Sequence, residues 1–279
     1  GATSVSGSIS MSGVMPPPPS TRRPAAVRKA GRPCVVVVAT TDKCYENRHT
    51  DEGYREDDRL GGRDPYSASK ACAELVVASY RQSFFADCVG VKLASARAGN
   101  VVGGGDWSRD RIVPDCIRAL RHGEPIRVRN KSATRPWQHV LEPLSGYLWL
   151  AAALERPQLV TQSDAKQLCE AFNFGPSMES NRTVAELVEE LLTHAPGSWT
   201  DASETAALHE AGKLHLAIDK ARDVLGWRPA WGFSETVRET VAWYQAEERG
   251  EDLLRTTQAQ IRKYQAAARA ANIPWAGRT

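Results

Sequence analysis

The sequence lacks the features that mark membrane, secreted and metal-binding proteins. Its 279 residues contain no apolar run near the ~20 residues that cross a bilayer, and its first stretch lacks the apolar middle of a secretory signal. The six cysteines form no C-x-x-C pair and the six histidines form no H-x-x-x-H pair. These absences argue against a zinc site and a dense disulfide framework. We therefore expect a soluble, cytoplasmic protein with no metal and no membrane partner.

A strong charge of either sign is also missing. The chain has 36 basic and 33 acidic residues, a net charge of +3. Nucleic-acid-binding domains usually carry a concentrated basic face, so this balance argues against nucleic acid as the main partner. The length is sufficient for one large or two modest domains with a real core.

The features that predict the fold and the function are concentrated between Cys34 and Lys70. The run C-V-V-V-V-A at 34–39 is apolar without alternation, which predicts a parallel-sheet strand buried on both faces between helices. Thr41, Asp42 and Lys43 follow it directly. In open α/β sheets the working residues lie beyond the carboxyl ends of strands, so these three are candidates for chemistry.

A second candidate group begins some twenty residues later. Tyr66 and Lys70 are four apart in P-Y-S-A-S-K, so on a helix their side chains share one face. An ammonium beside a phenol favours the ionised phenol, the form that can accept a proton.

Together these residues resemble a known superfamily. Tyr66-x-x-x-Lys70 after a strand ending in Thr41-Asp42 resembles the extended short-chain dehydrogenase/reductases. The fuller string T-D-K-C-Y-E-N at 41–47 is similar to their CDP-glucose 4,6-dehydratase branch. The resemblance runs from near Ala25 to about Tyr244. It implies NAD as cofactor, CDP-glucose as the nucleotide-sugar substrate, and a homo-oligomer in the intact family.

The resemblance also implies a role for each candidate. Tyr66 would take the proton of the sugar 4-hydroxyl, and Lys70 would hold the ionised tyrosine and the nicotinamide ribose. Thr41 would bind the 4-oxygen, Asp42 would protonate the departing 6-hydroxyl, and Lys43 would help remove the C5 proton. Taken singly, Asp42 is better explained as a turn cap and Lys43 as a solvated loop residue; the joint match with C-Y-E-N at 44–47, Tyr66 and Lys70 favours the dehydratase roles.

Three further residues acquire substrate roles from the resemblance. Asn100 lies in R-A-G-N-V-V-G, where the family places an asparagine against the nucleotide sugar; a left-handed turn residue is the alternative. Arg111 and Arg135 would bind the diphosphate, because a guanidinium offers paired donors. Surface ion pairing is the alternative for both.

The expected fold is α/β, a Rossmann-like doubly wound parallel sheet lacking its N-terminal glycine-rich half, with a smaller C-terminal α/β substrate-binding region. Such folds open with a G-x-G-x-x-G turn that holds the pyrophosphate, and none precedes Cys34. A helix over 142–154 is predicted to place Leu144 and Leu148 in the core. The expected domains are a disordered tail over 1–24, the remaining dinucleotide-binding domain over 25–102 with strands from 138–176, a mainly substrate-binding region over 103–250, and a helical extension over 251–279.

Two alternatives to an active dehydratase remain open. In the first, the chain lacks the glycine turn that binds the NAD pyrophosphate and is an inactive remnant, or a subunit completed by another polypeptide. A related sugar-nucleotide epimerase is the other alternative, although plain epimerases have no need for the Asp42-Lys43 pair.

Overall fold

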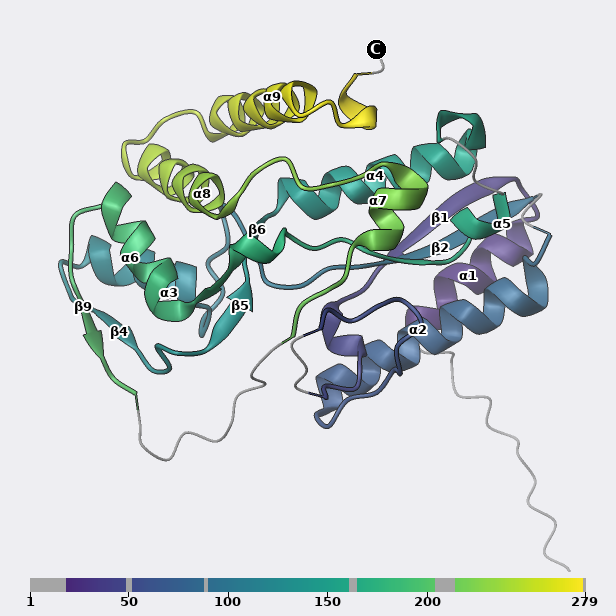
Figure 1. Cartoon of the computed structure of the whole chain (residues 1–279), viewed down its shortest axis with the longest axis horizontal. Coiled ribbons are helices and arrows are strands. Elements are labelled where there is room, and N and C mark those ends of the chain that lie inside the picture. The colour runs from purple at the N-terminus through teal and green to yellow at the C-terminus, as the bar shows by residue number, and fades with distance from the viewer. Residues whose placement is uncertain (1–18, 49–51, 88–89, 161–164, 204–213, 278–279) are drawn as a thin grey trace, which may run out of the picture.

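A three-stranded parallel sheet organises the larger part of the molecule. The computed structural model describes residues 19–48, 52–87, 90–160, 165–203 and 214–277 (Figure 1). Strands pair in the order β1-β2-β7, with bounds Cys34–Ala39, Val91–Arg97 and Ala171–Asn173. Both pairings are parallel, as predicted.

Helices cover both faces of this sheet (Figure 1). One face carries α1 (Pro19–Ala30) and α2 (Pro65–Phe84), and the other carries α4 (Leu141–Glu155) and α7 (Asp219–Leu225). The side chains of β1 alternate accordingly. Val35 and Val37 pack into the cluster built around α4, whereas Val36 and Val38 pack with Val77 of α2. The predicted α/β layering is confirmed.

Strand β1 is less buried than its apolar sequence predicts. All its residues except Ala39 are half-buried, and Ala39 is exposed. Helices lie against both faces of β1, as predicted, but the predicted full burial was wrong because β1 lies at the edge of the described sheet, with β2 on one side only. An apolar edge strand presents unpaired backbone donors and acceptors, which can recruit another strand.

A second region packs around its own core, at the left of Figure 1. Three short strand pairs, β3-β6, β4-β9 and β5-β8, lie here or lead into it. Their bounds are β3 Val101–Val102, β4 Ile126–Val128, β5 Thr134–Pro136, β6 Gln138–His139, β8 Asn181–Thr183 and β9 Trp199–Asp201. Helices α3 (Ile112–Arg121), α6 (Val184–His194) and α8 (Phe233–Glu248) enclose a separate apolar cluster.

Helix α9 (Leu253–Ala270) lies along α8 and returns the chain toward α4 (Figure 1). The Tyr264 hydroxyl donates to Glu142 Oε2 of α4 over 2.7 Å, and the Tyr264 ring stacks on Trp275. The remaining short elements are η1 Asp42–Cys44, η2 Pro157–Leu159, α5 Ala165–Leu168, η3 Met178–Ser180 and η4 Pro274–Ala276.

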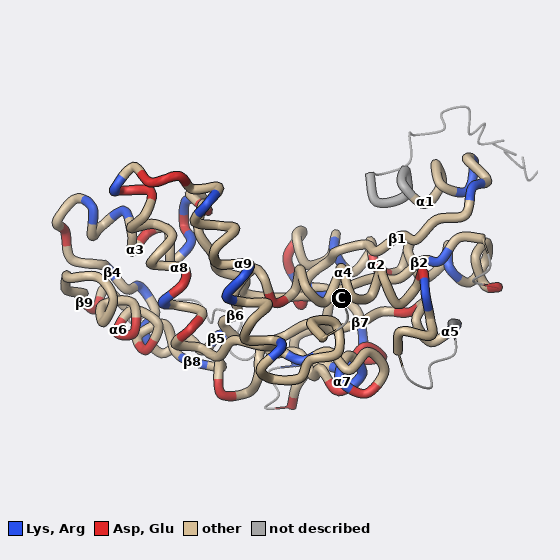
Figure 2. The backbone as a smooth tube through the Cα atoms, turned by 90° about the horizontal axis from the view of Figure 1, so that it is seen from above, with Lys and Arg blue, Asp and Glu red and all other residues tan. Residues whose placement is uncertain are grey.

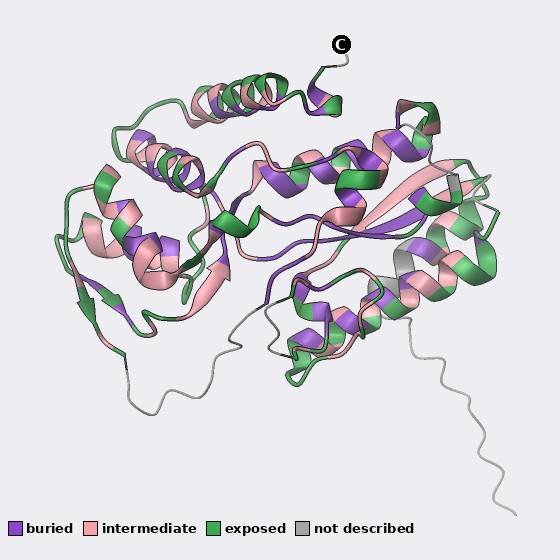
Figure 3. Cartoon of the chain, viewed as in Figure 1, coloured by how far each residue is buried: buried purple, intermediate pink, exposed green. Residues whose placement is uncertain are grey.

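Two local predictions differ from the structure. Residues 19–24 of the expected 1–24 tail belong to α1, and residues 1–18 lie outside the described part of the chain. Helix α4 carries buried and exposed residues side by side (Figure 3). Leu144 and Leu148 are 44% and 73% exposed, because α4 instead turns Trp149, Leu150 and neighbouring residues toward the core.

Charged residues of both signs are interspersed along the described chain (Figure 2). Among the described helices, none combines the length and the apolar character that a membrane span needs.

Candidate functional site

The turn after β1 buries an acid. Asp42 begins η1 and is 3% exposed. The Thr41 hydroxyl donates to Asp42 Oδ1 over 2.9 Å and accepts from the Lys43 amide over 3.3 Å. On the other side, Asp42 lies against Gly99, where a Cβ atom would fall 1.9 Å from Asp42 Oδ2. A residue larger than glycine at position 99 would therefore displace the carboxyl group.

This burial changes the chemistry of Asp42. Desolvation raises the pKa of its carboxyl from 3.8 to about 6, although the Thr41 hydroxyl and the Lys43 charge act in the opposite direction. A carboxyl that titrates near 6 can release a proton to a leaving group close to neutral pH. An ordinary turn-capping aspartate would be ionised throughout that range and could not serve as an acid.

Helix α2 brings Tyr66 and Lys70 to the same end of the sheet, since α2 packs against η1. Its start is fixed by Asp64, whose carboxylate accepts from the Ser67 amide over 2.9 Å, and by Pro65 in the first turn. The Lys43 charge contributes to the lowered pKa of Asp64, behind the hydrogen bonds from Ser67. Lys43 therefore lies near the N-terminus of this helix.

Tyr66 is open to solvent, and Lys70 is half-buried. Tyr66 is 53% exposed, and Lys70 Nζ lies 5.5 Å from the centre of the Tyr66 ring. The pair is formed as the spacing predicted, on a surface that a ligand can reach.

A buried polar network behind these residues was not anticipated from the sequence. Glu74 and Arg97, 3% and 4% exposed at their side chains, form an ion pair with a 3.0 Å N–O distance. Glu74 also accepts from the hydroxyls of Thr40 and Ser95, and Arg97 donates to the Tyr45 hydroxyl over 2.6 Å. The position of Glu74 four residues after Lys70, in an otherwise mostly apolar stretch of helix, was the available signal.

The loop after β2 contains Asn100, next to Gly99, which lies against the Asp42 carboxyl. Asn100 has a φ of 43°, so it occupies the left-handed region that asparagine tolerates. The turn alternative therefore accounts for its residue type, and its substrate role stays a prediction. Nearby, the Gln138 amide group donates to the carbonyls of Gly99 and Phe174 over 2.9 and 3.2 Å, tying together the ends of β2 and β7.

The two candidate arginines lie in different settings. Arg135 is half-buried on β5, and its charge is among those that oppose the rise in the Asp42 pKa. Its Nη1 donates to the Thr134 carbonyl over 2.9 Å. Arg111 precedes α3, has a 64% exposed side chain and lies 3.9 Å from Asp106. Arg135 is thus electrostatically linked to the Asp42 turn, whereas Arg111 pairs with its own loop.

The residues present fit one end of a dinucleotide. The Tyr66–Lys70 pair, in which the Tyr66 ring is exposed, offers a hydroxyl and an ammonium to a ribose. The sequence contains no G-x-G-x-x-G turn for a pyrophosphate. Within the described ranges, no three His, Cys, Asp or Glu side chains are grouped to hold a metal ion.

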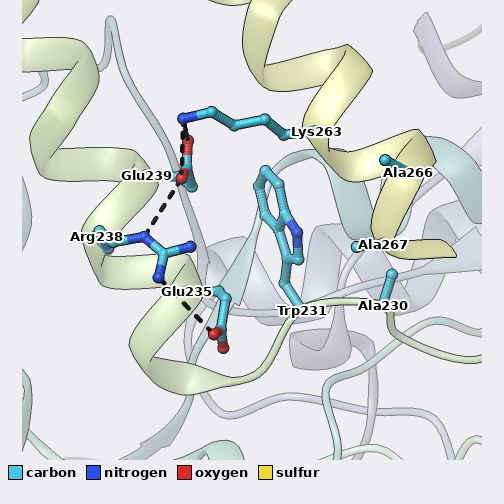
Figure 4. Close-up of a pocket in the computed structure, with 8 residues that line it drawn as sticks. All are labelled: Ala230, Trp231, Glu235, Arg238, Glu239, Lys263, Ala266 and Ala267. Carbon is cyan, nitrogen blue, oxygen red and sulfur yellow. Dashed lines mark hydrogen bonds and ion pairs between the residues drawn. The ribbon is translucent and has the colours of Figure 1, made fainter. Parts of the chain in front are cut away.

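A cavity of about 550 Å³ lies elsewhere, between α8 and α9 (Figure 4). Its lining residues are Ala230, Trp231, Glu235, Arg238, Glu239, Lys263, Ala266 and Ala267. Glu239 pairs with Lys263 at 3.2 Å and Arg238 at 3.4 Å, so the charges largely compensate one another. None of the candidate residues lines this cavity, and we assign it no part in the site.

Comparison with known proteins gives a consistent result. Residues 25–240 match the family described as GDP-mannose 4,6 dehydratase. Over 247 residues the chain is 44% identical to CDP-glucose 4,6-dehydratase of Salmonella typhimurium, covering 86% of this chain and 67% of that enzyme. The low-salt glycan biosynthesis protein Agl12 of Haloferax volcanii is 29% identical, and the match spans 74% of this chain and 60% of the relative.

Solved structures establish the fold. The chain superposes on dTDP-glucose 4,6-dehydratase from Bacillus anthracis in complex with NAD with a TM-score of 0.66, 20% identity, and coverage of 83% of this chain and 68% of that one. MoeE5 in complex with UDP-glucose and NAD gives a TM-score of 0.67 at 21% identity, covering 82% and 70%. The predicted Rossmann-like fold is confirmed. This chain spans about two thirds of the length of these solved chains, as the prediction of an incomplete fold implied.

Proposed function

Because the chain belongs to the GDP-mannose 4,6 dehydratase family, we propose that it is a sugar-nucleotide 4,6-dehydratase acting on CDP-glucose. The observation that carries the proposal is the buried Asp42, next to Lys43 and at the end of the sheet where α2 presents Tyr66 and Lys70. An acid of raised pKa beside a proton-accepting pair is what elimination of water from a sugar requires.

Each side chain then has one task. Tyr66, with Lys70 Nζ 5.5 Å from the centre of its ring, accepts the proton of the sugar 4-hydroxyl, and Thr41 holds the 4-oxygen. Once C4 is a ketone, the C5 proton is acidic and Lys43 helps to remove it; a proton returns to C5 when the hydride comes back to C6. Asp42 delivers its proton to the 6-hydroxyl, which leaves as water.

The cofactor in this proposal is NAD, which supplies a hydride acceptor at C4 and returns the hydride at C6. Tyr66 and Lys70 would hold its nicotinamide ribose. They are the residues of this chain that we assign to the cofactor, so we expect binding to be weak in the absence of a glycine turn. The solved relatives named above carry NAD in their complexes, which supports this choice of cofactor.

The second region supplies most of the substrate contacts in this proposal. We assign residues 103–250 mainly to the nucleotide sugar and 25–102, with β7, to the cofactor side. Arg135 and Arg111 bind the diphosphate, and Asn100 contacts the sugar. The preference for cytidine rests on the likeness to the Salmonella enzyme. A homo-oligomeric assembly, which the family resemblance implies, and a cytoplasmic location, which the cysteine pattern predicts, are further parts of the proposal.

The test is conversion of CDP-glucose. Purified chain, CDP-glucose and NAD at up to about 1 mM, the concentration range of weak binding, are incubated and the nucleotide sugar is analysed by mass spectrometry and NMR. We expect a 4-keto-6-deoxy product, lighter by one water, that forms faster from CDP-glucose than from dTDP- or UDP-glucose. Recovery of a C4 epimer of unchanged mass would favour the epimerase alternative. Absence of turnover together with absence of NAD binding would favour the inactive remnant.

A further inference from the structure

The ion pair between Glu74 and Arg97 has no part in the chemistry above. Burying two charges removes hydration that their mutual attraction often fails to replace, so such a pair is weak evidence for a gain in stability. Glu74 projects from α2 into the layer between helix and sheet, and Arg97 is the last residue of β2. The hydrogen bonds that Glu74 and Arg97 make with other residues indicate a different role for the pair.

Its hydrogen bonds reach both ends of the turn that carries the acid. The hydroxyl of Thr40, the residue before Thr41, donates to Glu74 Oε1. Arg97 Nη1 donates to the hydroxyl of Tyr45, which follows η1 and in turn donates to Asn173 Oδ1 over 2.8 Å. The segment from Thr40 to Tyr45 is therefore held at its start by the carboxylate and at its end by the guanidinium.

The same pair anchors the helix of the proton-accepting residues. Glu74 lies one turn beyond Lys70 and two beyond Tyr66 on α2. A shift of α2 along the sheet would break the bond from Glu74 to Thr40 or the bond to Arg97. The contact thus links two elements that lie more than twenty residues apart in the sequence.

We propose that Glu74 and Arg97 are positioning residues, which fix the Thr41–Lys43 turn relative to the helix that carries Tyr66 and Lys70. The catalytic meaning of this arrangement rests on the proposed function. The arrangement itself is a property of the chain without ligands, and it can be tested there.

The reporter is the titration of Asp42, followed by carboxyl carbon NMR and assigned with Asp42→Asn. Thr40→Val removes only the hydroxyl that Glu74 holds, and Thr40→Ser keeps it. The double variant Glu74→Met/Arg97→Met removes the whole pair while filling its volume with apolar groups, which avoids an unpaired buried charge. We expect Thr40→Val and the double variant to lower the pKa of Asp42 by about one unit, from about 6 toward 3.8. Thr40→Ser should restore it.

A matched control uses another pair of the same types. Arg121 and Glu247 pair at 2.6 Å but are 28% and 29% exposed and lie on α3 and α8. The double variant Arg121→Met/Glu247→Met should leave the Asp42 titration unchanged. If Thr40→Val leaves it unchanged as well, the pair is only a core element and the proposal is overturned; this holds even if the double variant at 74 and 97 does not fold.

The titration needs neither sugar nor NAD, so it is read independently of activity. If CDP-glucose is converted, we further expect Thr40→Val to lower kcat roughly tenfold with little change in the KM for the sugar, because the fault lies in alignment and not in binding. If CDP-glucose is not converted, the proposed function fails while the NMR result still stands.

Discussion

The two parts of the candidate site differ in how much protein surrounds them. The Thr41–Lys43 turn is supported from behind by Glu74 and Arg97, and its acid is 3% exposed. Tyr66, in contrast, is 53% exposed, and Lys70 Nζ lies 5.5 Å from the centre of its ring. The protein alone therefore encloses the Asp42 carboxyl, and burial raises its pKa. The Tyr66 side chain lies on an open surface, so its surroundings during the reaction depend on the bound sugar and cofactor.

We expect the largest effect from replacing tyrosine by phenylalanine, once at the exposed Tyr66 and once at the buried Tyr45 behind the acid. Tyr66→Phe removes the proton acceptor, so we expect conversion of CDP-glucose to fall about 10²–10⁴-fold. Its unfolding free energy should stay within about 0.5 kcal/mol of the parent, since the ring is largely exposed. Tyr45→Phe removes a buried hydroxyl that joins Arg97 to Asn173 and should cost about 1–3 kcal/mol.

Urea denaturation and product assays of the two variants check this contrast. If Tyr66→Phe lost several kcal/mol of unfolding free energy, the Tyr66 hydroxyl would contribute to the fold, and the contrast between an exposed Tyr66 and a buried acid would not hold.

The buried pair offers the next largest effect. Arg97→Met leaves the Glu74 carboxylate buried without its counter-ion, so we expect a loss of about 3–5 kcal/mol in unfolding free energy. Arg121→Met, at the partly exposed pair with Glu247, should cost no more than about 1 kcal/mol. Denaturation midpoints at constant m-value measure both. Equal losses would mean that burial does not distinguish the two pairs.

The same contrast explains how much could be read from the sequence. Groups that depend on local spacing were predictable: the strand at 34–39 and the helix carrying Tyr66 and Lys70. Each is set by neighbours within four residues or by an uninterrupted apolar run.

What depended on partners distant in sequence was missed. Strand β1 looked fully buried because an apolar run does not reveal which strands flank it. Leu144 and Leu148 looked like core residues because nearly every position of α4 is apolar, so the pattern could not select the inward face. The network of Glu74, Arg97 and Tyr45 joins three separate segments, and none carries a local signal for the others.

Asp42 allows the burial of the acid to be tested through stability. Its folded pKa of about 6 exceeds the unfolded value of 3.8, so the folded state binds more protons between these pH values. Stability should therefore fall as pH rises through this window and level off above about pH 6, with a total cost of about 2–3 kcal/mol. Asp42→Asn cannot ionise and should escape this cost.

We thus expect the advantage of Asp42→Asn over the parent in urea denaturation to be larger at pH 8 than at pH 4. An advantage that is equal at both pH values would mean that Asp42 titrates normally and that its burial does not prepare it as an acid.

The smallest effect concerns the backbone contact that closes the acid in. In Gly99→Ala the new Cβ would fall on the Asp42 carboxyl, so the turn must move, with a cost of about 1–3 kcal/mol. Gly90→Ala is the matched control, because a Cβ there meets no atom within 4 Å and the loss of a glycine restricts the unfolded chain. Gly90→Ala should be neutral or slightly stabilising. If Gly99→Ala were equally harmless in stability and left the Asp42 titration in place, the carboxyl would have room to move, and the buried half of the site would be as adaptable as the exposed half.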